Sequence, residues 1–293
     1  MKILFFGSAE FALPTLQQLL ASRHQVVGVV AQSDKPAGRG QKITACPVAA
    51  FAKKQKLLLL QPERLDAAAC ANLLSKQADL LVVVAYGKFL PQSLVLGAPK
   101  GATNLHPSLL PKYRGAAPIQ WAILNGDRTT GVSTMKVADE MDAGDLYLQE
   151  EFAVDSNETA ETLHDRLSVA GASLISKTID GLEKGTLVAR PQDSSKVILA
   201  PKLTKEMGLL DFAEPAVVLE RKVRALQPWP GTYFIWKGKK MIVHRAEVVS
   251  VGAADNADAW VVPCGQDGLR LLEVQLEGKR RMTAQEFRKG SQC

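Results

Sequence analysis

The sequence predicts an α/β fold with a doubly wound open sheet, followed by a small antiparallel β-barrel. Three observations lead to this prediction. Short apolar runs rich in β-branched residues alternate with helical patterns in the first half of the chain. A polar, proline-bearing stretch without periodicity follows Gly185. Beyond it, the pattern changes to short strand-like segments separated by turns.

The elements before Gly185 begin in the order β, α, β, α, β. The strands are expected at residues 2–7 (KILFFG), 24–30 (HQVVGVV), 79–87 (DLLVVVAYG), 129–137 (TTGVSTMKV) and 145–154 (DLYLQEEFAV). The third is a continuous apolar run, which is typical of a parallel strand buried on both faces. Ser8 could cap a helix after the first strand, and an amphipathic helix at 157–184 has Glu158 and Glu161 in its first turn.

The length of 293 residues exceeds the usual size of one compact core, so two domains are expected. The change of pattern divides the chain into a first domain at 1–185, a linker at 186–206 and a barrel domain at 207–293. Within the last, a helical stretch (PAVVLERKVRAL) precedes the strand-like segments TYFIW, MIVHRAEVV, AWVVPC and GLRLLEVQLEG.

The composition is that of an ordinary soluble globular protein, with 46% hydrophobic and 23% charged residues. Gly7 and Glu10 interrupt the opening apolar run, so we expect no signal peptide, no membrane association and a cytoplasmic location. The four cysteines form no CxxC pair and no metal-binding spacing with the four histidines, so neither disulfides nor a metal are expected. A net charge of +6 suits a polyanionic partner, but it is spread along the chain and decides nothing alone.

Residues 104–123, NLHPSLLPKYRGAAPIQWAI, hold the first candidate site. If GATNLH is a strand, Asn104 and His106 project from the same face, and Pro107 ends the strand at the sheet edge where ligands bind. An amide donor and an imidazolium can stabilise an oxyanion, and imidazole can move protons near neutral pH, as acyl transfer requires. Alternatively, both side chains satisfy loop backbone, and spacing alone does not separate the two interpretations.

The turn VADEMDAGD (137–145) is the second candidate, because it carries four carboxylates between two expected strands. One of them could orient His106 and favour its charged form. The alternatives are a metal site or a solvated turn. The spacing does not match an EF-hand, and no histidine is nearby in the sequence.

Two loops at strand ends are possible places for contacts with phosphates, and only the first has a composition that supports them. QSDKPAGRGQK (32–42) carries Lys35, Arg39 and Lys42 and could follow a nucleic-acid backbone, although a mobile surface loop is the common meaning of such composition. The first strand leads into GSAEFALP, which lacks the GxGxxG fingerprint, so a nicotinamide-dependent enzyme is the minor hypothesis.

NLHPSLLPKYRGAAPIQWAI followed by MDAGD resembles the formyltransferase family that takes a formyl group from 10-formyltetrahydrofolate. DKPAGRG, APKLTKE and VRALQPWPGTYF resemble the branch of that family whose acceptor is methionyl-tRNA. The resemblance runs from residue 2 to 289 with the motifs in the same order. It implies a monomeric enzyme with a Rossmann-like catalytic domain and an OB-like barrel that binds tRNA.

The resemblance also implies residue roles. It places catalysis on Asn104, His106 and Asp142. It places folate contacts on Ser108, Leu109, Leu110, Pro111, Val84 and Tyr86, and contacts with initiator methionyl-tRNA on Phe11, Lys35, Arg39 and Lys42. The chain departs from the family pattern at AEFA, KEMG and ILAPKLTKE, none of which includes a catalytic position.

The expected reaction is direct attack of the methionyl α-amine on the formyl carbon. Asn104 and protonated His106 would hold the oxyanion, and Asp142 would stabilise the imidazolium and help to receive the amine proton. Three alternatives remain at this point: a formyltransferase for an amino sugar nucleotide, one for a purine precursor, and a non-catalytic RNA-binding protein.

Overall fold

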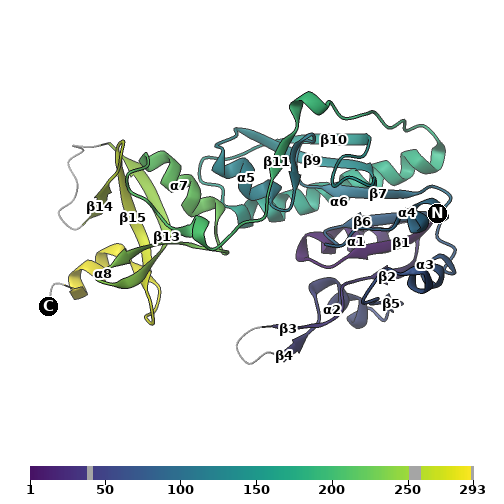
Figure 1. Ribbon diagram of the computed structural model, residues 1–293, viewed down its shortest axis with the longest axis horizontal. Coiled ribbons are helices and arrows are strands. Elements are labelled where there is room, and N and C mark those ends of the chain that lie inside the picture. The colour runs from purple at the N-terminus through teal and green to yellow at the C-terminus, as the bar shows by residue number, and fades with distance from the viewer. Residues whose placement is uncertain (38–41, 251–258, 292–293) are drawn as a thin grey trace. The chain divides into compact units, whose positions relative to one another are not determined.

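The computed structural model describes residues 1–37, 42–250 and 259–291 (Figure 1). The chain divides into two compact units, and the backbone passes between them several times. The first unit comprises Met1–Gly115, Thr130–Phe152 and His164–Leu199, and the second comprises Ala116–Thr129, Ala153–Leu163 and Ala200–Cys293.

The described residues of the first unit are built around a seven-stranded sheet in the order β10-β9-β7-β6-β1-β2-β5. The strands are β1 (Lys2–Gly7), β2 (Gln25–Val30), β5 (Leu59–Leu60), β6 (Leu80–Val84), β7 (Ala102–His106), β9 (Thr129–Lys136) and β10 (Leu146–Ala153). The five strands from β5 to β7 are parallel, and β9 runs antiparallel to β7. The expected doubly wound open sheet is therefore confirmed.

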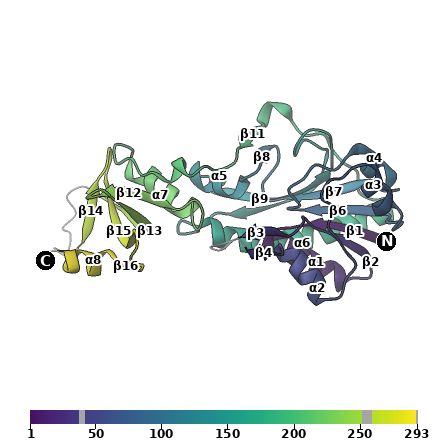
Figure 2. The same cartoon turned by 60° about the horizontal axis from the view of Figure 1, so that its bottom comes forward.

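Helices cover both faces of this sheet, as the continuous apolar runs of its central strands require. They are α1 (Leu13–Leu20), α2 (Pro47–Lys54), α3 (Ala67–Leu74), α4 (Gln92–Gly97) and α6 (Ala160–Lys184). Figure 2 shows α3 and α4 on one side of the sheet and α1 and α6 on the other. Leu81 and Val83 of β6 pack in one cluster with Cys70 of α3 and Leu94 of α4. Residues in register with Leu81 and Val83 on neighbouring strands therefore face α3 and α4.

Two short strand pairs lie outside the main sheet. β3 (Lys35–Ala37) pairs antiparallel with β4 (Lys42–Thr44), so the described part of the predicted basic segment at 32–42 contributes to two short strands. β8 (Lys112–Gly115) pairs with β11 (Ile198–Ala200). The segment expected to be an aperiodic linker thus contributes a strand beside the candidate site.

The described residues of the second unit form five antiparallel strands of a small OB-like barrel, as expected. They are β12 (Thr232–Trp236), β13 (Lys239–Val249), β14 (Trp260–Pro263), β15 (Gly268–Leu276) and β16 (Met282–Thr283). Its helices are α5 (Pro118–Leu124), α7 (Ala216–Ala225) and α8 (Ala284–Ser291). The strand-like segments predicted from the sequence end with GLRLLEVQLEG, so β16 and α8 were not predicted.

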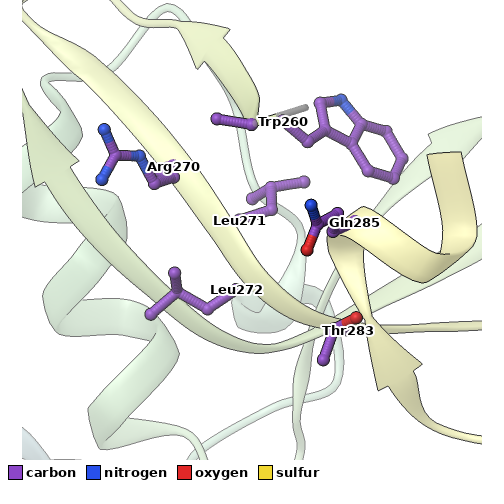
Figure 3. A pocket seen from close by; sticks show the side chains of 7 residues that line it. Trp260, Arg270, Leu271, Leu272, Thr283 and Gln285 are labelled. Carbon is purple, nitrogen blue, oxygen red and sulfur yellow. The ribbon is translucent and has the colours of Figure 1, made fainter. Parts of the chain in front are cut away.

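A pocket of about 310 Å³ lies on the barrel. Figure 3 shows the side chains that line it, which include Trp260 of β14, Leu271 of β15, Thr283 of β16 and Gln285 of α8. None of the sequence-predicted site residues lines it. The predicted catalytic residues lie instead in the first unit: Asn104 and His106 are on β7, and Asp142 is in the turn between β9 and β10.

Candidate functional site

β7 brings Asn104 and His106 to one face of the sheet. Asn104 lies in register with Val83 of β6, which packs in the α3 and α4 cluster, whereas Leu105 lies in register with Val84. Because side chains alternate along a strand, Asn104 and His106 face α3 and α4 while Leu105 faces the opposite side. The Asn104 side chain is half-buried, and no hydrogen-bond partner of its amide is found among the described residues. It is available to a ligand.

The imidazole of His106 is held between two oxygen atoms. The side chain is buried, with Nε2 2.9 Å from the carbonyl oxygen of Tyr113 and Nδ1 3.6 Å from Oδ1 of Asp142. A carbonyl oxygen only accepts hydrogen bonds, so Nε2 carries a proton. Nδ1 is consequently the atom whose protonation decides the charge of the ring. The predicted juxtaposition of His106 with Asp142 is present.

Asp142 is held in an uncommon backbone conformation. Its φ is 54°, in the left-handed region, which costs a residue other than glycine about 1 kcal/mol. Its Oδ2 accepts a hydrogen bond of 2.9 Å from the backbone N–H of Gly115. Two residues later, a Cβ on Gly144 would overlap the carbonyl oxygen of Lys136, so only glycine fits there. The position of the Asp142 carboxylate is therefore restricted by its hydrogen bond to Gly115 and by the close backbone approach at Gly144.

The SLLP segment is anchored by polar side chains from β9 and β10. Ser133 Oγ donates to the carbonyl of Ser108 at 2.6 Å and accepts from the N–H of Leu110 at 3.1 Å. Gln149 Nε2 donates to the carbonyl of Leu110 and to Ser133 Oγ, both at 2.9 Å. Sequence reasoning missed Ser133 and Gln149. The sequence feature that could have indicated them is the presence of one polar residue in each of the two expected strands that follow the candidate segment.

The predicted folate contacts differ in exposure. Ser108 and Leu110 are buried, whereas Leu109 and Pro111 are half-buried and present the segment's accessible side chains. Val84 is fully buried at the end of β6. Leu109, Pro111 and the backbone are therefore the parts of this segment that a ligand can reach, and the amide of Asn104 adds a hydrogen-bond donor nearby in the chain.

Three parallel strands are tied together where they end. Ser8, after β1, donates through Oγ to the carbonyl of Tyr86 at 3.1 Å and accepts from the N–H of Gln32 at 3.1 Å. Gln32, after β2, donates through Nε2 to the same Tyr86 carbonyl at 2.8 Å. Because β1 and β6 adjoin at the point where the strand order reverses, this network lies where open α/β sheets bind ligands.

The side chain of Tyr86 lies in the core rather than in an open pocket. It is 1% exposed and packs edge-on against Phe6, with 5.4 Å between ring centroids. Its hydroxyl group is buried and has no hydrogen-bond partner among the described residues. Burial raises the pKa of Tyr86 to about 12, so the hydroxyl group is neutral at physiological pH.

Substitution of Tyr86 by phenylalanine is expected to raise the free energy of unfolding by about 1 kcal/mol, because it removes a buried hydroxyl group that makes no hydrogen bond. Urea unfolding of the two proteins measures this difference. A rise in the KM for the formyl donor, with stability lowered, would show instead that the hydroxyl group binds the pterin ring.

The residues predicted to contact tRNA are distributed as follows. Phe11 is 5% exposed and packs edge-on against His164, with 5.3 Å between ring centroids. Lys35 is exposed at the start of β3, and its Nζ donates to Gln32 Oε1 at 3.0 Å. Lys42 begins β4. Arg39 lies outside the described residues.

One group of possible metal ligands exists among the described residues, namely His24, Asp180 and Glu183. Both carboxylates already form ion pairs with Arg23, and His24 Nε2 is 3.3 Å from Asp180 Oδ1. The two carboxylates of this cluster are therefore already paired with positively charged groups of the protein. Within the described ranges, no helix has both the length and the apolar character needed to cross a membrane.

Comparison with known proteins assigns both parts of the chain to one family. Residues 1–179 match the family described as "Formyl transferase", and residues 202–292 match "Formyl transferase, C-terminal domain". The methionyl-tRNA formyltransferase of Caldanaerobacter subterraneus subsp. tengcongensis is 39% identical, over 98% of this chain and 96% of its own. That of Desulfotalea psychrophila is 42% identical, over 98% and 92%.

Solved structures share the fold at much lower identity. An N-formyltransferase from Helicobacter canadensis, in complex with folinic acid and dTDP-3-aminofucose, aligns with a TM-score of 0.70 at 16% identity, over 92% of this chain and 98% of its own. HypX from Aquifex aeolicus aligns with a TM-score of 0.66 at 17% identity, over 99% of this chain and 47% of its own. With the relatives at about 40% identity over nearly the whole length, these matches lead to one conclusion: the chain belongs to the formyl transferase family, among the methionyl-tRNA formyltransferases.

Proposed function

We propose that this chain transfers the formyl group of 10-formyltetrahydrofolate to the free α-amine of initiator methionyl-tRNA. The names of its relatives support this acceptor, and the arrangement of Asn104, His106 and Asp142 supports the chemistry. The single observation that carries the proposal is the buried His106 ring, which faces the Asp142 carboxylate at 3.6 Å on the strand face that also presents a free amide.

The reaction forms a bond between the amine nitrogen and the formyl carbon and breaks the bond from that carbon to the folate nitrogen. Negative charge develops on the formyl oxygen as the amine attacks. Asn104 donates the hydrogen bond that stabilises this charge, because its amide is not engaged by the described part of the protein. The donor exists before the reaction begins, so no reorganisation is needed at the transition state.

His106 and Asp142 act as a pair. With Nε2 donating to Tyr113, a second proton on Nδ1 makes the ring cationic, and this charge assists Asn104 at the oxyanion. Asp142 stabilises the cation and, directly or through water, receives the proton that the amine loses. The proton that Asp142 has received then passes, directly or through water, to the folate nitrogen as that nitrogen leaves, which restores the enzyme to its starting state. The separation of 3.6 Å between Nδ1 and Oδ1 exceeds a hydrogen bond, which leaves the Nδ1 proton free to be shared with the substrate.

The tRNA partner is supported by charge on the barrel. The β12–β13 turn and the β15–β16 turn lie side by side, joined by a hydrogen bond from the N–H of Glu277 to the carbonyl of Lys240. These turns and the first two residues of β13 carry Lys237, Lys239, Lys240, Lys279, Arg280 and Arg281, of which Arg281 is ion-paired with Glu273. Such a cluster attracts a phosphate backbone without reading its sequence.

A formyl-transfer assay tests the proposal directly. Formylation of charged initiator methionyl-tRNA, with uncharged tRNA and a dTDP-amino sugar as parallel acceptors, should give product only with the charged tRNA. The sugar acceptor is included because the Helicobacter canadensis enzyme, whose complex contains dTDP-3-aminofucose, shares the fold. Product from the sugar alone would replace the proposed acceptor, and binding of tRNA without any product would favour a non-catalytic RNA-binding protein.

Arg39→Ala is expected to lower kcat/KM for methionyl-tRNA and to flatten its dependence on salt. Removing one arginine–phosphate interaction with a duplex changes the slope of log affinity against log salt by about 0.9. Measurements between low and physiological salt give the slope, and Lys184→Ala, outside the basic loop, is the control. If both kcat/KM and the salt slope are unchanged by the Arg39 substitution, the loop at 32–42 is a surface feature only.

We also infer the functional division into a catalytic domain at 1–185, a linker at 186–206 and a tRNA-binding barrel at 207–293. The two family matches, at 1–179 and 202–292, support this division. We further propose a cytoplasmic location, because initiator methionyl-tRNA is used where translation begins. We propose a monomer, and light scattering of the purified protein tests this oligomeric state.

A further inference from the structure

The turn that carries Asp142 is held by a residue from a distant segment of the chain. Gln192 follows α6 and lies in the predicted linker, yet its Nε2 is 2.8 Å from the carbonyl oxygen of Asp142 and 2.8 Å from that of Gly144. We propose that Gln192 is a positioning residue for Asp142, so that the linker is part of the catalytic site. This inference rests on the proposed function, because it takes Asp142 to be catalytic.

The orientation of the Gln192 amide is determined by its partners. Nε2 has two hydrogens and faces two carbonyl oxygens, which can only accept. Oε1 accepts a hydrogen bond of 3.0 Å from Nε of Arg114, which can only donate. If the amide were flipped, Oε1 would face the two carbonyl oxygens and the NH2 group would face the Arg114 guanidinium. Neither pair could form a hydrogen bond. The side chain is therefore a fully satisfied three-way bridge.

This bridge acts on the residue whose carboxylate faces His106. Asp142 has a φ of 54°, and Gln192 binds its main-chain carbonyl while Gly115 binds its carboxylate. The two interactions hold opposite ends of one residue. Without Gln192, the main-chain carbonyl of Asp142 keeps no side-chain donor among the described residues, and the carboxylate can move relative to the His106 ring.

The segment containing Gln192 is itself attached to the catalytic segment. β11, six residues after Gln192, pairs with β8, which supplies both Arg114 and Gly115. Arg114 also reaches the acidic turn through Nη1, 3.6 Å from Oε1 of Glu140. The acidic turn is thus contacted by two segments that are far apart in the sequence: β8, which follows His106, and the segment with Gln192, which follows α6. A merely space-filling linker would not require a glutamine with every polar atom used.

The test is a double-mutant cycle in the full-length protein. Gln192→Ala alone is expected to lower kcat by about tenfold to hundredfold, with the KM of both substrates changed by less than about twofold, because a misplaced catalytic group costs turnover rather than binding. In an Asp142→Ala background, the same substitution should lower kcat by less than about twofold, since the group that it positions is already absent. Thermal unfolding confirms that each variant is folded.

Two further variants keep the test decisive. Gln192→Glu retains length but offers no donor to the two carbonyls, so it should be as impaired as Gln192→Ala even where its melting temperature matches the parent. Asp193→Ala disturbs the adjacent linker residue, whose carboxylate accepts from the N–H of Ser195 at 3.1 Å and does not touch the turn. It should retain parental kcat.

Three results would overturn the inference. Equal losses from Gln192→Ala in both backgrounds, or a loss from Asp193→Ala as large as that from Gln192→Ala, would show a general structural role. Full activity of Gln192→Ala would show that the bridge is dispensable. If Asp142→Ala itself retains parental turnover, the catalytic role assigned to Asp142 fails, which is distinct from failure of the Gln192 bridge.

Discussion

Asn104→Ala is expected to lower kcat by about 10² to 10³, the usual loss when one oxyanion donor is removed. Its amide is a donor without a partner among the described residues, so the loss falls on the transition state. The KM for methionyl-tRNA should change little, because the interaction forms as charge develops. Steady-state kinetics with both substrates near saturation measure the effect.

Asn104→Asp is the sharper form of this experiment. Aspartate has nearly the same shape as asparagine, but it places an acceptor with negative charge beside the formyl oxygen. It should therefore be at least as impaired as Asn104→Ala, whereas a side chain that only fills space would tolerate it. RNA affinity, measured by filter binding, serves as the control. Turnover within a few-fold of the parent for both variants would remove Asn104 from the mechanism.

Gly144→Ala is expected to lower both stability and activity, because the new methyl group would force the backbone of the turn to move. A Cβ at this position would overlap the carbonyl oxygen of Lys136 and lie 2.8 Å from its carbonyl carbon. Backbone atoms cannot move aside as a flexible side chain can, so the turn must shift. We expect a loss of about 2–4 kcal/mol in the free energy of unfolding and, because Asp142 moves with the turn, about a hundredfold loss in kcat.

The matched control is Gly101→Ala. Gly101 also precedes a strand of the first unit, and nothing lies within 4 Å of the Cβ that it would gain, although its φ is +68°. This variant should show only the conformational cost of about 1 kcal/mol, with parental kcat. Urea unfolding and kinetics of the two variants separate the effects. Equal behaviour of both variants would mean that the close approach at Gly144 is tolerated.

Local patterns predicted the strands and the first half of the site. Continuous apolar runs indicated β1, β2 and β6 within a few residues, because buried parallel strands need such runs. The period of two along a strand placed Asn104 and His106 on one face, and the register with β6 agrees. Both inferences depend on neighbours in the sequence, which is why the sequence suffices for them.

The remaining features depend on contacts between distant parts of the chain. Spacing could not tell which of the four carboxylates at 137–145 meets the imidazole, and Asp142 was selected by family resemblance. Nothing in the sequence marks Tyr113 as the partner of Nε2, since the contact is made by its backbone carbonyl. β11 has three residues, too few for any periodicity, so its pairing with β8 could not be predicted.

The pairing of β8 with β11 means that the proposed catalytic domain at 1–185 depends on contacts from the segment that follows it. A fragment cut after Gly185 would discard both the strand that borders Arg114 and the amide that bridges Asp142 and Gly144. Anyone dissecting or grafting this enzyme therefore needs to carry the chain onward to Ala200, and new barrels or tags should be joined beyond that residue.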